Sequence, residues 1–432
     1  MGKIEIDHTG SGGGITLSSD GTDLLLGGTA IGGSALELYV ENPSTPTTPL
    51  AGGTNGVAIG SSTNAGGVSS IALGSGSAAG DYAFAVQIGG GSTSYGAVGN
   101  YSIAMGQSAR ASDTNATSIG YLAWAQASES TSIGPYTDAG SYRSTAIGYN
   151  AQGYGTNAVA LANSRAGGTD SFAAAIANNT SSYGATGSNS IAMGYQADAF
   201  NTYSVAIGRS AIAGGDTALA LGEARANGVR SIAIGTTISS GKGASGIYAI
   251  AIGYNSASTG TGSVCLGPEN TSSSQYAVAI GRYASSAVEG KLAYAAGRFA
   301  AAGDAQGGQF ILRADTTDAT ATVLTTNNST AGSTNQIVAA SDTCITFDGT
   351  ITAMQNGAQA YASWKIEGLL VNDGGTTTLA NSATTVISNA DGWGMALSAD
   401  NTNNALAITV TGEAAHNIRW VANIRTTEVT YA

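Results

Sequence analysis

The chain has 432 residues, of which 64 are glycine and only 10% are charged, and its formal net charge is −12. This acidic balance disfavours a nucleic-acid partner, and glycine without a strict three-residue period excludes a collagen helix. Two cysteines, Cys265 and Cys344, cannot make a disulfide framework.

Membrane insertion is not expected from the sequence. Residues 1–7 are polar and charged and lack the apolar stretch of a signal peptide. Nowhere do 18 apolar residues follow one another, so no transmembrane helix is predicted.

Residues 1–50 are expected to form a small N-terminal β module followed by a proline-rich linker. Short apolar segments alternate there with glycine turns, as in β structure: Ile4–Ile6, Gly14–Leu17, Asp23–Gly27 and Leu36–Val40. The linker, Glu41–Pro49, contains three prolines and is expected to be extended.

Residues 51–302 are organised by one recurring phrase, in which an alanine stands between two larger apolar residues and a glycine follows. Copies include Val57-Ala58-Ile59-Gly60, Ile103-Ala104-Met105-Gly106, Val205-Ala206-Ile207-Gly208, Ile232-Ala233-Ile234-Gly235 and Val278-Ala279-Ile280-Gly281. The commonest spacing between copies is 14 residues. This period is too short for helical hairpin repeats and suits one coil of a β-solenoid.

The phrase also predicts how each coil is built. Because side chains alternate across a strand, Val205 and Ile207 share one face and Ala206 takes the other. Gly208 permits a tight turn with positive φ. A second, weaker strand of small residues follows the glycine. Cys265 stands where the phrase has alanine, so we expect a small core residue rather than a reactive thiol.

Such narrow coils leave apolar surface uncovered in a single chain. Burial of apolar area is favourable only where that area has a partner. We therefore expect an obligate homo-oligomer whose isoleucine and valine faces meet at a shared axis.

The phrase Ser-Val/Ile-Ala-Ile/Leu/Met-Gly, followed by x-x-Ala-x-Ala, resembles the head repeat of trimeric autotransporter adhesins. The resemblance extends from Val57 to about Gly297. It implies a left-handed parallel β-roll with three chains around one axis, and hence a homotrimer. The secretion signal, coiled-coil stalk and membrane barrel of that family are not recognisable here.

Some coils are longer than the rest, around Tyr95, Tyr183 and Lys242. These insertions are either binding decorations or loops that a solenoid tolerates on one face.

Residues 303–432 have a different pattern, with longer alternating strands separated by Asp-Gly turns. This pattern predicts an antiparallel β-sandwich or jelly roll. Trp364 and Trp420, flanked by strand residues, are expected in its core. The segment is similar in general pattern to the C-terminal domain of phage tail fibres, including those of cyanophages.

Candidate binding residues lie in this C-terminal region. Tyr361 and Trp393 could stack on sugar rings, while the side chains of Asn372, Asp373 and Asp391 could bond hydroxyl groups. Trp393 lies between two glycines, which favours an exposed loop, with a place in the core as the alternative. The two histidines lack partners at metal-ligand spacing, and no catalytic or phosphate-binding motif is present. We therefore expect no enzyme, metal or cofactor.

Together these features predict an all-β, homotrimeric virion appendage such as a phage tail fibre. Residues 1–50 would contact virion tail or capsid proteins, or else only cap the solenoid. Residues 51–302 would form the shaft, and residues 303–432 would trimerise and bind a host-surface glycan or protein. The alternatives are a head fragment of a bacterial trimeric surface adhesin and a structural capsid or tail decoration without a ligand.

Overall fold

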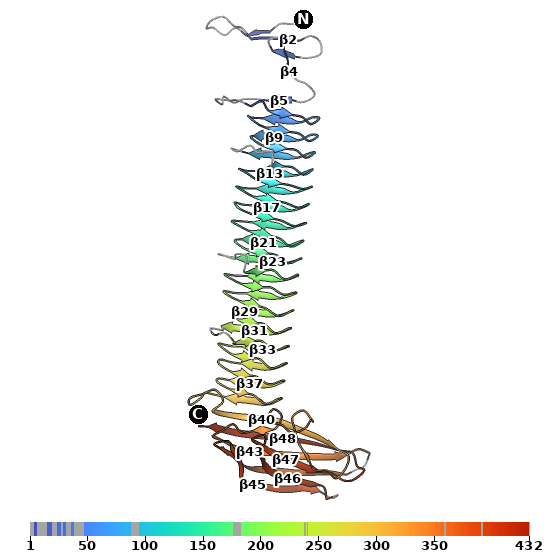
Figure 1. The fold of residues 1–432 in the computed structure, drawn as a ribbon, viewed down its shortest axis with the longest axis vertical. Coiled ribbons are helices and arrows are strands. Elements are labelled where there is room, and N and C mark those ends of the chain that lie inside the picture. The colour runs from blue at the N-terminus through green and yellow to red at the C-terminus, as the bar shows by residue number, and fades with distance from the viewer. Residues whose placement is uncertain are drawn as a thin grey trace. The chain divides into compact units, whose positions relative to one another are not determined.

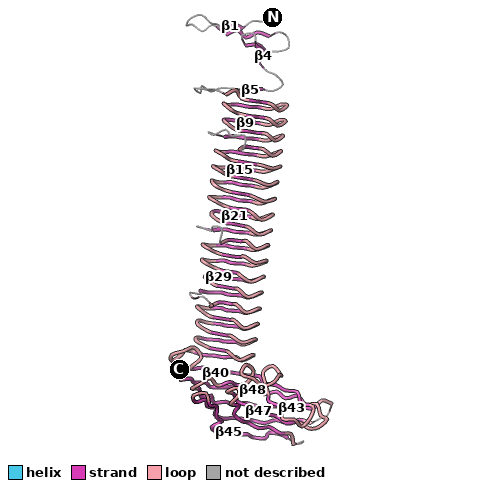
Figure 2. Tube along the Cα trace, viewed as in Figure 1, coloured by secondary structure: helices cyan, strands magenta, loops and turns pink. Residues whose placement is uncertain are grey.

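The computed structural model describes residues 47–87, 95–175, 183–236, 239, 241–357, 360–389 and 392–431, and near the N-terminus it describes only the strands β1–β5. The chain divides into two units, Met1–Phe200 and Asn201–Ala432. The described residues contain strands and turns but no helix, as expected for an all-β chain (Figures 1 and 2).

The first unit begins with an antiparallel sheet in the order β1-β2-β3-β4, formed by β1 (Ile4–Ile6), β2 (Ile15–Ser19), β3 (Leu24–Leu26) and β4 (Thr29–Ile31). The fourth and last predicted strand of the N-terminal module behaves differently. β5 (Leu36–Leu38) pairs in parallel with the first repeat strand, β7, and so belongs to the sheet of the solenoid. Most of the proline-rich linker lies outside the described residues.

The repeats of the first unit form a parallel β-solenoid with two strands per coil. The first strand of each coil, the A strand, carries the repeat phrase: β7 (Val57–Ile59), β9 (Ile71–Gly74), β11 (Phe84–Gln87), β13 (Ile103–Met105), β15 (Thr117–Ile119), β17 (Thr131–Ile133), β19 (Thr145–Ile147), β21 (Val159–Ala162), β23 (Phe172–Ala175) and β25 (Ile191–Met193). The second, or B, strands are β6 (Leu50–Ala51), β8 (Asn64–Ala65), β10 (Ser77–Ala78), β12 (Gly96–Ala97), β14 (Arg110–Ala111), β16 (Trp124–Ala125), β18 (Asp138–Ala139), β20 (Gln152–Gly153), β22 (Arg165–Ala166), β24 (Gly184–Ala185) and β26 (Asp198–Ala199).

The second unit opens with coils of the same design, here called the roll. Its A strands are β27 (Val205–Ile207), β29 (Leu219–Glu223), β31 (Ile232–Thr236), β33 (Ile250–Ile252), β35 (Val264–Leu266), β37 (Val278–Gly281) and β39 (Leu292–Ala295). Its B strands are β28 (Ile212–Ala213), β30 (Arg225–Ala226), β32 (Gly243–Ala244), β34 (Ala257–Ser258), β36 (Thr271–Ser272) and β38 (Ser285–Ser286).

The alternation within the phrase decides which side chains fill a coil. Ala206, Ala211 and Ala213 point inward and have no exposed surface, whereas Val205 and Ile207 point outward. Cys265 replaces the inward alanine in β35 and is fully buried, as expected. The interior is narrow because alanine leaves the two strands of a coil close together.

Both turns of a coil depend on left-handed backbone. Gly208 has a φ of 127°, and an added Cβ would lie 2.5 Å from the carbonyl oxygen of Gly222 in the next coil. The other turn places a non-glycine residue in the left-handed region, such as Tyr203 with a φ of 57°. A buried serine closes this turn, since Ser204 Oγ donates to the carbonyl oxygen of Asn201 at 2.6 Å.

The C-terminal part of the second unit is a two-layer antiparallel sandwich. Its larger sheet has the order β40-β48-β43-β44-β45, formed by β40 (Ala305–Thr316), β48 (Ile418–Thr430), β43 (Thr343–Gln355), β44 (Tyr361–Asp373) and β45 (Thr376–Asn389). The smaller sheet contains β41 (Thr322–Val323), β42 (Ile337–Val338), β46 (Gly394–Asp400) and β47 (Ala405–Thr411). The predicted sandwich is therefore present.

Large apolar side chains from both sheets meet between the layers of this sandwich. Phe310, Ile351 and Trp420 come from the larger sheet, and Leu406 and Ile408 from the smaller. Trp364 and Trp420 stack with ring centroids 5.8 Å apart, as expected for core residues.

Candidate functional site

The A strands of the second unit present an apolar surface, here called the A face. Register between successive coils places the outward side chains in two columns: Val205, Leu219, Ile232, Ile250, Val264, Val278 and Leu292 in one, and Ile207, Leu221, Ile234, Ile252, Leu266, Ile280 and Tyr294 in the other. Ile207, Ile252 and Leu266 are each 37–38% exposed. An apolar surface this regular and continuous is typical of a protein–protein interface.

The first unit carries a similar feature on its own A strands, although Thr117, Thr131 and Thr145 occupy the first outward position in three successive coils. Ile71, Ile103, Met105, Ile147 and Met193 point outward and are 37–40% exposed. Here, too, alanine or serine fills the interior, so the larger apolar residues have no partner within the coil.

The outward side chains of the B strands are mixed by comparison. In the second unit they include Ile212, Arg225, Thr271 and Ser285. The outward side chains of the A strands are therefore more apolar than those of the B strands, and the A face is the better candidate for an interface between proteins.

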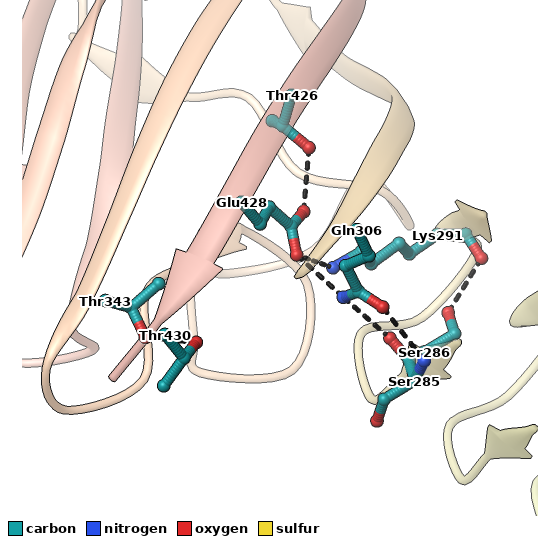
Figure 3. A network of polar contacts seen from close by, with 8 residues as sticks. All are labelled: Ser285, Ser286, Lys291, Gln306, Thr343, Thr426, Glu428 and Thr430. Carbon is teal, nitrogen blue, oxygen red and sulfur yellow. Dashed lines mark hydrogen bonds and ion pairs between the residues drawn. The ribbon is translucent and has the colours of Figure 1, made fainter. Parts of the chain in front are cut away.

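The last coil of the second unit is joined to the C-terminal sandwich by a buried ion pair (Figure 3). Lys291 Nζ and Glu428 Oε2 lie 2.6 Å apart, and both side chains are at most 8% exposed. Gln306 Nε2 donates to the same carboxylate oxygen at 2.8 Å and to the backbone oxygen of Ser285 at 3.0 Å, and the Thr426 hydroxyl donates to Glu428 Oε1.

Comparison with known proteins identifies the repeats. Residues 51–77, 97–123, 114–137, 139–161, 185–211, 213–237, 244–267 and 258–284 match the YadA head domain repeat, which is the head of trimeric autotransporter adhesins. These coils are similar to YadA head repeats. The expected resemblance is thereby confirmed, and the chain is adhesin-like over these residues. No curated protein matches the chain.

The matches to the YadA head repeat end at residue 284, before the C-terminal sandwich. The binding residues predicted from the sequence all lie beyond that point. Of those that the structure describes, Trp393 and Asn372 are buried, whereas Tyr361 and Asp373 are exposed at opposite ends of β44.

Trp393 is buried, so the prediction of an exposed loop is wrong and the core alternative is right. Its side chain is 3% exposed and packs edge-on against Trp420, with ring centroids 5.7 Å apart. Asn389 holds the turn, because its Nδ2 donates to the Trp393 carbonyl at 2.9 Å and its Oδ1 accepts from the Trp393 N–H at 3.0 Å. The glycines on either side let the chain direct the indole inward.

Asn372 is also buried, with a structural role. Its Nδ2 donates to the carbonyl of Ala339 at 2.8 Å, and its Oδ1 accepts from the N–H of Gly375 at 2.9 Å. These bonds hold the turn between β44 and β45, and the side chain is only 1% exposed, so the amide does not face a ligand at the surface.

The exposed candidates do not form a common site. Tyr361, 61% exposed, begins β44, and Asp373 ends it. A strand rises about 3.3 Å per residue, which separates them by roughly 40 Å. Asp391 lies outside the described residues.

Residues 88–94 and 176–182, next to Tyr95 and Tyr183, lie outside the described part of the chain, as do several residues near Lys242. Among the described residues, no cluster of histidine, cysteine and acidic side chains could hold a metal ion. No helix in the described part of the chain is long and apolar enough to cross a membrane.

The sequence did not reveal the Lys291–Glu428 pair, although it contains one signal. In most coils a serine or alanine precedes the A strand and points inward, as Ser204 does before Val205. A lysine at that position in the last coil indicates that the interior ends there and that an acidic partner must follow.

Proposed function

We propose that the chain is a trimeric attachment fibre whose copies associate along the A face of the YadA head repeats. The apolar columns of Val205 and Ile207 carry this proposal. Each copy holds the same strip of apolar side chains, and burying it against the equivalent strip of another copy would remove it from water.

Cyclic symmetry is the natural arrangement for such a strip. A ring of copies around one axis lets every chain use the same surface and closes the assembly, whereas an open arrangement would leave apolar edges at both ends. The trimeric adhesins that share the head repeat favour three copies.

The setting that we propose is a virion appendage such as a phage tail fibre. In it, the N-terminal residues contact tail or capsid proteins, and the trimer binds a glycan or protein on the host surface. The pattern of residues 303–432 supports this setting. Three weak sites on one fibre would bind with higher avidity than one site alone. The proposed role is attachment, without catalysis.

A bacterial surface adhesin is the second candidate, and the YadA head repeats favour it equally. Both candidates predict a trimer that binds a surface, and they differ in what anchors the N-terminus. A fibre that only decorates a capsid or tail would be trimeric and would bind no receptor.

Two measurements on the full chain test the proposal. Sedimentation equilibrium in dilute buffer should give three times the chain mass of 42.4 kDa, and a monomer at micromolar concentration would refute it. The trimer should then bind host cells or an array of cell-surface glycans, whereas a trimer without any such binding would point to a decoration. Labelling an N-terminal tag on virions and on bacterial cells would distinguish the two settings.

A further inference from the structure

The A face of the roll continues without interruption onto the C-terminal sandwich. β39, the last A strand, pairs in antiparallel fashion with β40, and Leu292 lies opposite Gln309 while Tyr294 lies opposite Gly307. Directly opposed residues of two paired strands point to the same side of a sheet. The outward columns of the roll and the outer side of β40 therefore belong to one surface.

That surface extends over the whole larger sheet of the sandwich. The smaller sheet covers only the inner side, where Phe310, Ile351 and Trp420 are buried. On the outer side, here called the open face, alternate residues of β40, β48, β43 and β44 are exposed or half-buried. They include the apolar side chains of Ile311, Met354, Tyr361, Val421 and Val429, which are 48–64% exposed.

The charges on the open face are balanced, unlike those of the chain as a whole. Four basic and four acidic side chains lie on it: Arg313, Lys365, Arg419, Arg425, Asp315, Asp348, Glu367 and Asp373. Arg425 Nη2 lies 2.6 Å from Asp348 Oδ2, and Arg419 Nε lies 3.2 Å from Asp315 Oδ1. A chain of net charge −12 would repel its own copies elsewhere, but not at this neutral face.

The open face is also hollowed at both ends. A groove of about 670 Å³ is lined by Thr352, Met354, Arg419 and Val421, among others. A second groove, of about 530 Å³, lies beside Tyr294, Gln309 and Arg425, where the sheet meets the roll. Grooves between exposed apolar side chains can accept side chains from an opposing surface.

We propose that the open face of the larger sheet is an interface between copies of this chain, continuous with the A face of the roll. The inference rests on the proposed trimer. Its occupant is a second copy, because the surface shares one sheet and one side with the columns that the trimer buries. It follows that receptor contacts are made elsewhere, on the outer side of the smaller sheet or on the loops of the sandwich, and that Tyr361 faces a sister chain.

Site-directed cross-linking of the full chain tests this inference. Single cysteines are introduced into a Cys344→Ser background, since Cys265 is fully buried. Thr350→Cys lies in the middle of the open face, Ser398→Cys on the outer side of the smaller sheet, and Ile207→Cys on the A face. A short tris-maleimide reagent is added, and covalent multimers are separated under denaturing conditions.

Covalent multimers from Thr350→Cys and Ile207→Cys, with Ser398→Cys remaining monomeric, are the expected result. Multimers from Ile207→Cys alone would overturn the open-face interface and leave the proposed trimer standing. If neither variant gives multimers, both the trimer and this inference fail. If Ser398→Cys cross-links as well as Thr350→Cys, the contact is unspecific and the inference is wrong.

Discussion

Lys291 Nζ lies 2.6 Å from Glu428 Oε2, and this contact joins the last coil of the roll to the last strand of the sandwich across 137 residues of sequence. The lysine occupies an inward position that other coils fill with serine or alanine. A charge inside a narrow coil is tolerated only with a partner, and Glu428, Gln306 and Thr426 complete its surroundings.

We expect Glu428→Gln to destabilise the second unit by about 3–5 kcal/mol, because it leaves the Lys291 ammonium buried and unpaired. The double variant Lys291→Ser/Glu428→Gln removes both charges and should recover part of this loss. Thermal unfolding followed by tryptophan fluorescence would measure the effect, since Trp364, Trp393 and Trp420 lie in the sandwich. An unchanged melting temperature for Glu428→Gln would contradict the role assigned to the pair.

Gly208→Ala tests the turn that closes each coil. The φ of 127° and the added Cβ only 2.5 Å from the Gly222 carbonyl oxygen should cost about 1–3 kcal/mol. Gly297→Ala is the matched control, because an added Cβ there meets nothing within 4 Å. Its unfolding free energy should change by less than about 0.5 kcal/mol. If the two substitutions lowered the unfolding free energy equally, the left-handed turn at Gly208 would not be what makes glycine necessary there.

Cys265 should be chemically silent in the folded protein. Burial raises the pKa of its thiol to about 12 from an ordinary value of 9.0. Between these values the unfolded chain releases the proton and the folded chain keeps it, so this group's contribution to stability is complete below pH 9 and falls as pH rises toward 12. In a Cys344→Ser background, a thiol reagent at pH 8 should label the protein only after denaturation. Rapid labelling of the native protein would refute the burial.

The division between interior and surface in the coils could be predicted from the sequence because the evidence there is local. Ala206 and Ile207 are adjacent, and strand alternation alone assigns them to opposite faces. Trp393 is a residue whose direction the local sequence pattern does not decide. Two flanking glycines identify a turn, but whether the indole points in or out depends on Asn389 and on Trp420, neither of which the local pattern includes.

The Lys291–Glu428 pair could not be predicted from the sequence for a related reason. Charged residues are rare in this chain, and nothing in the repeat connects position 291 with a strand at the far end of the sandwich. Asn372 illustrates the same limit, since a polar residue beside a turn is as suited to holding the turn as to binding a ligand. Whether such a residue has a structural or a binding role depends on contacts with residues far away in the sequence.

The corrected position of Trp393 leads to a prediction that separates packing from binding. Trp393→Ala should destabilise the sandwich by about 3–5 kcal/mol, as truncation of a buried aromatic residue does. Tyr431→Ala, at a side chain that is 91% exposed, should have little effect on unfolding in denaturant. A Trp393→Ala protein of normal stability that had lost glycan binding would restore the exposed-loop interpretation.

Association through the A face is tested most directly by placing a charge on it. Ile207→Glu would bury one carboxylate per chain at the interface without a partner, and we expect association to weaken by about 3 kcal/mol or more, at least about a hundredfold. Thr271→Glu adds the same charge on a B strand of the same unit, where the outward position of the next coil is the polar Ser285, and should leave the assembly intact. Sedimentation velocity over a range of concentrations would compare the two variants. Because the substitution lies outside the coil, Ile207→Glu should keep the strand content of the parent protein by circular dichroism, so that a loss of assembly can be assigned to the surface. An Ile207→Glu protein that still sediments as the parent assembly would show that the copies meet through another face.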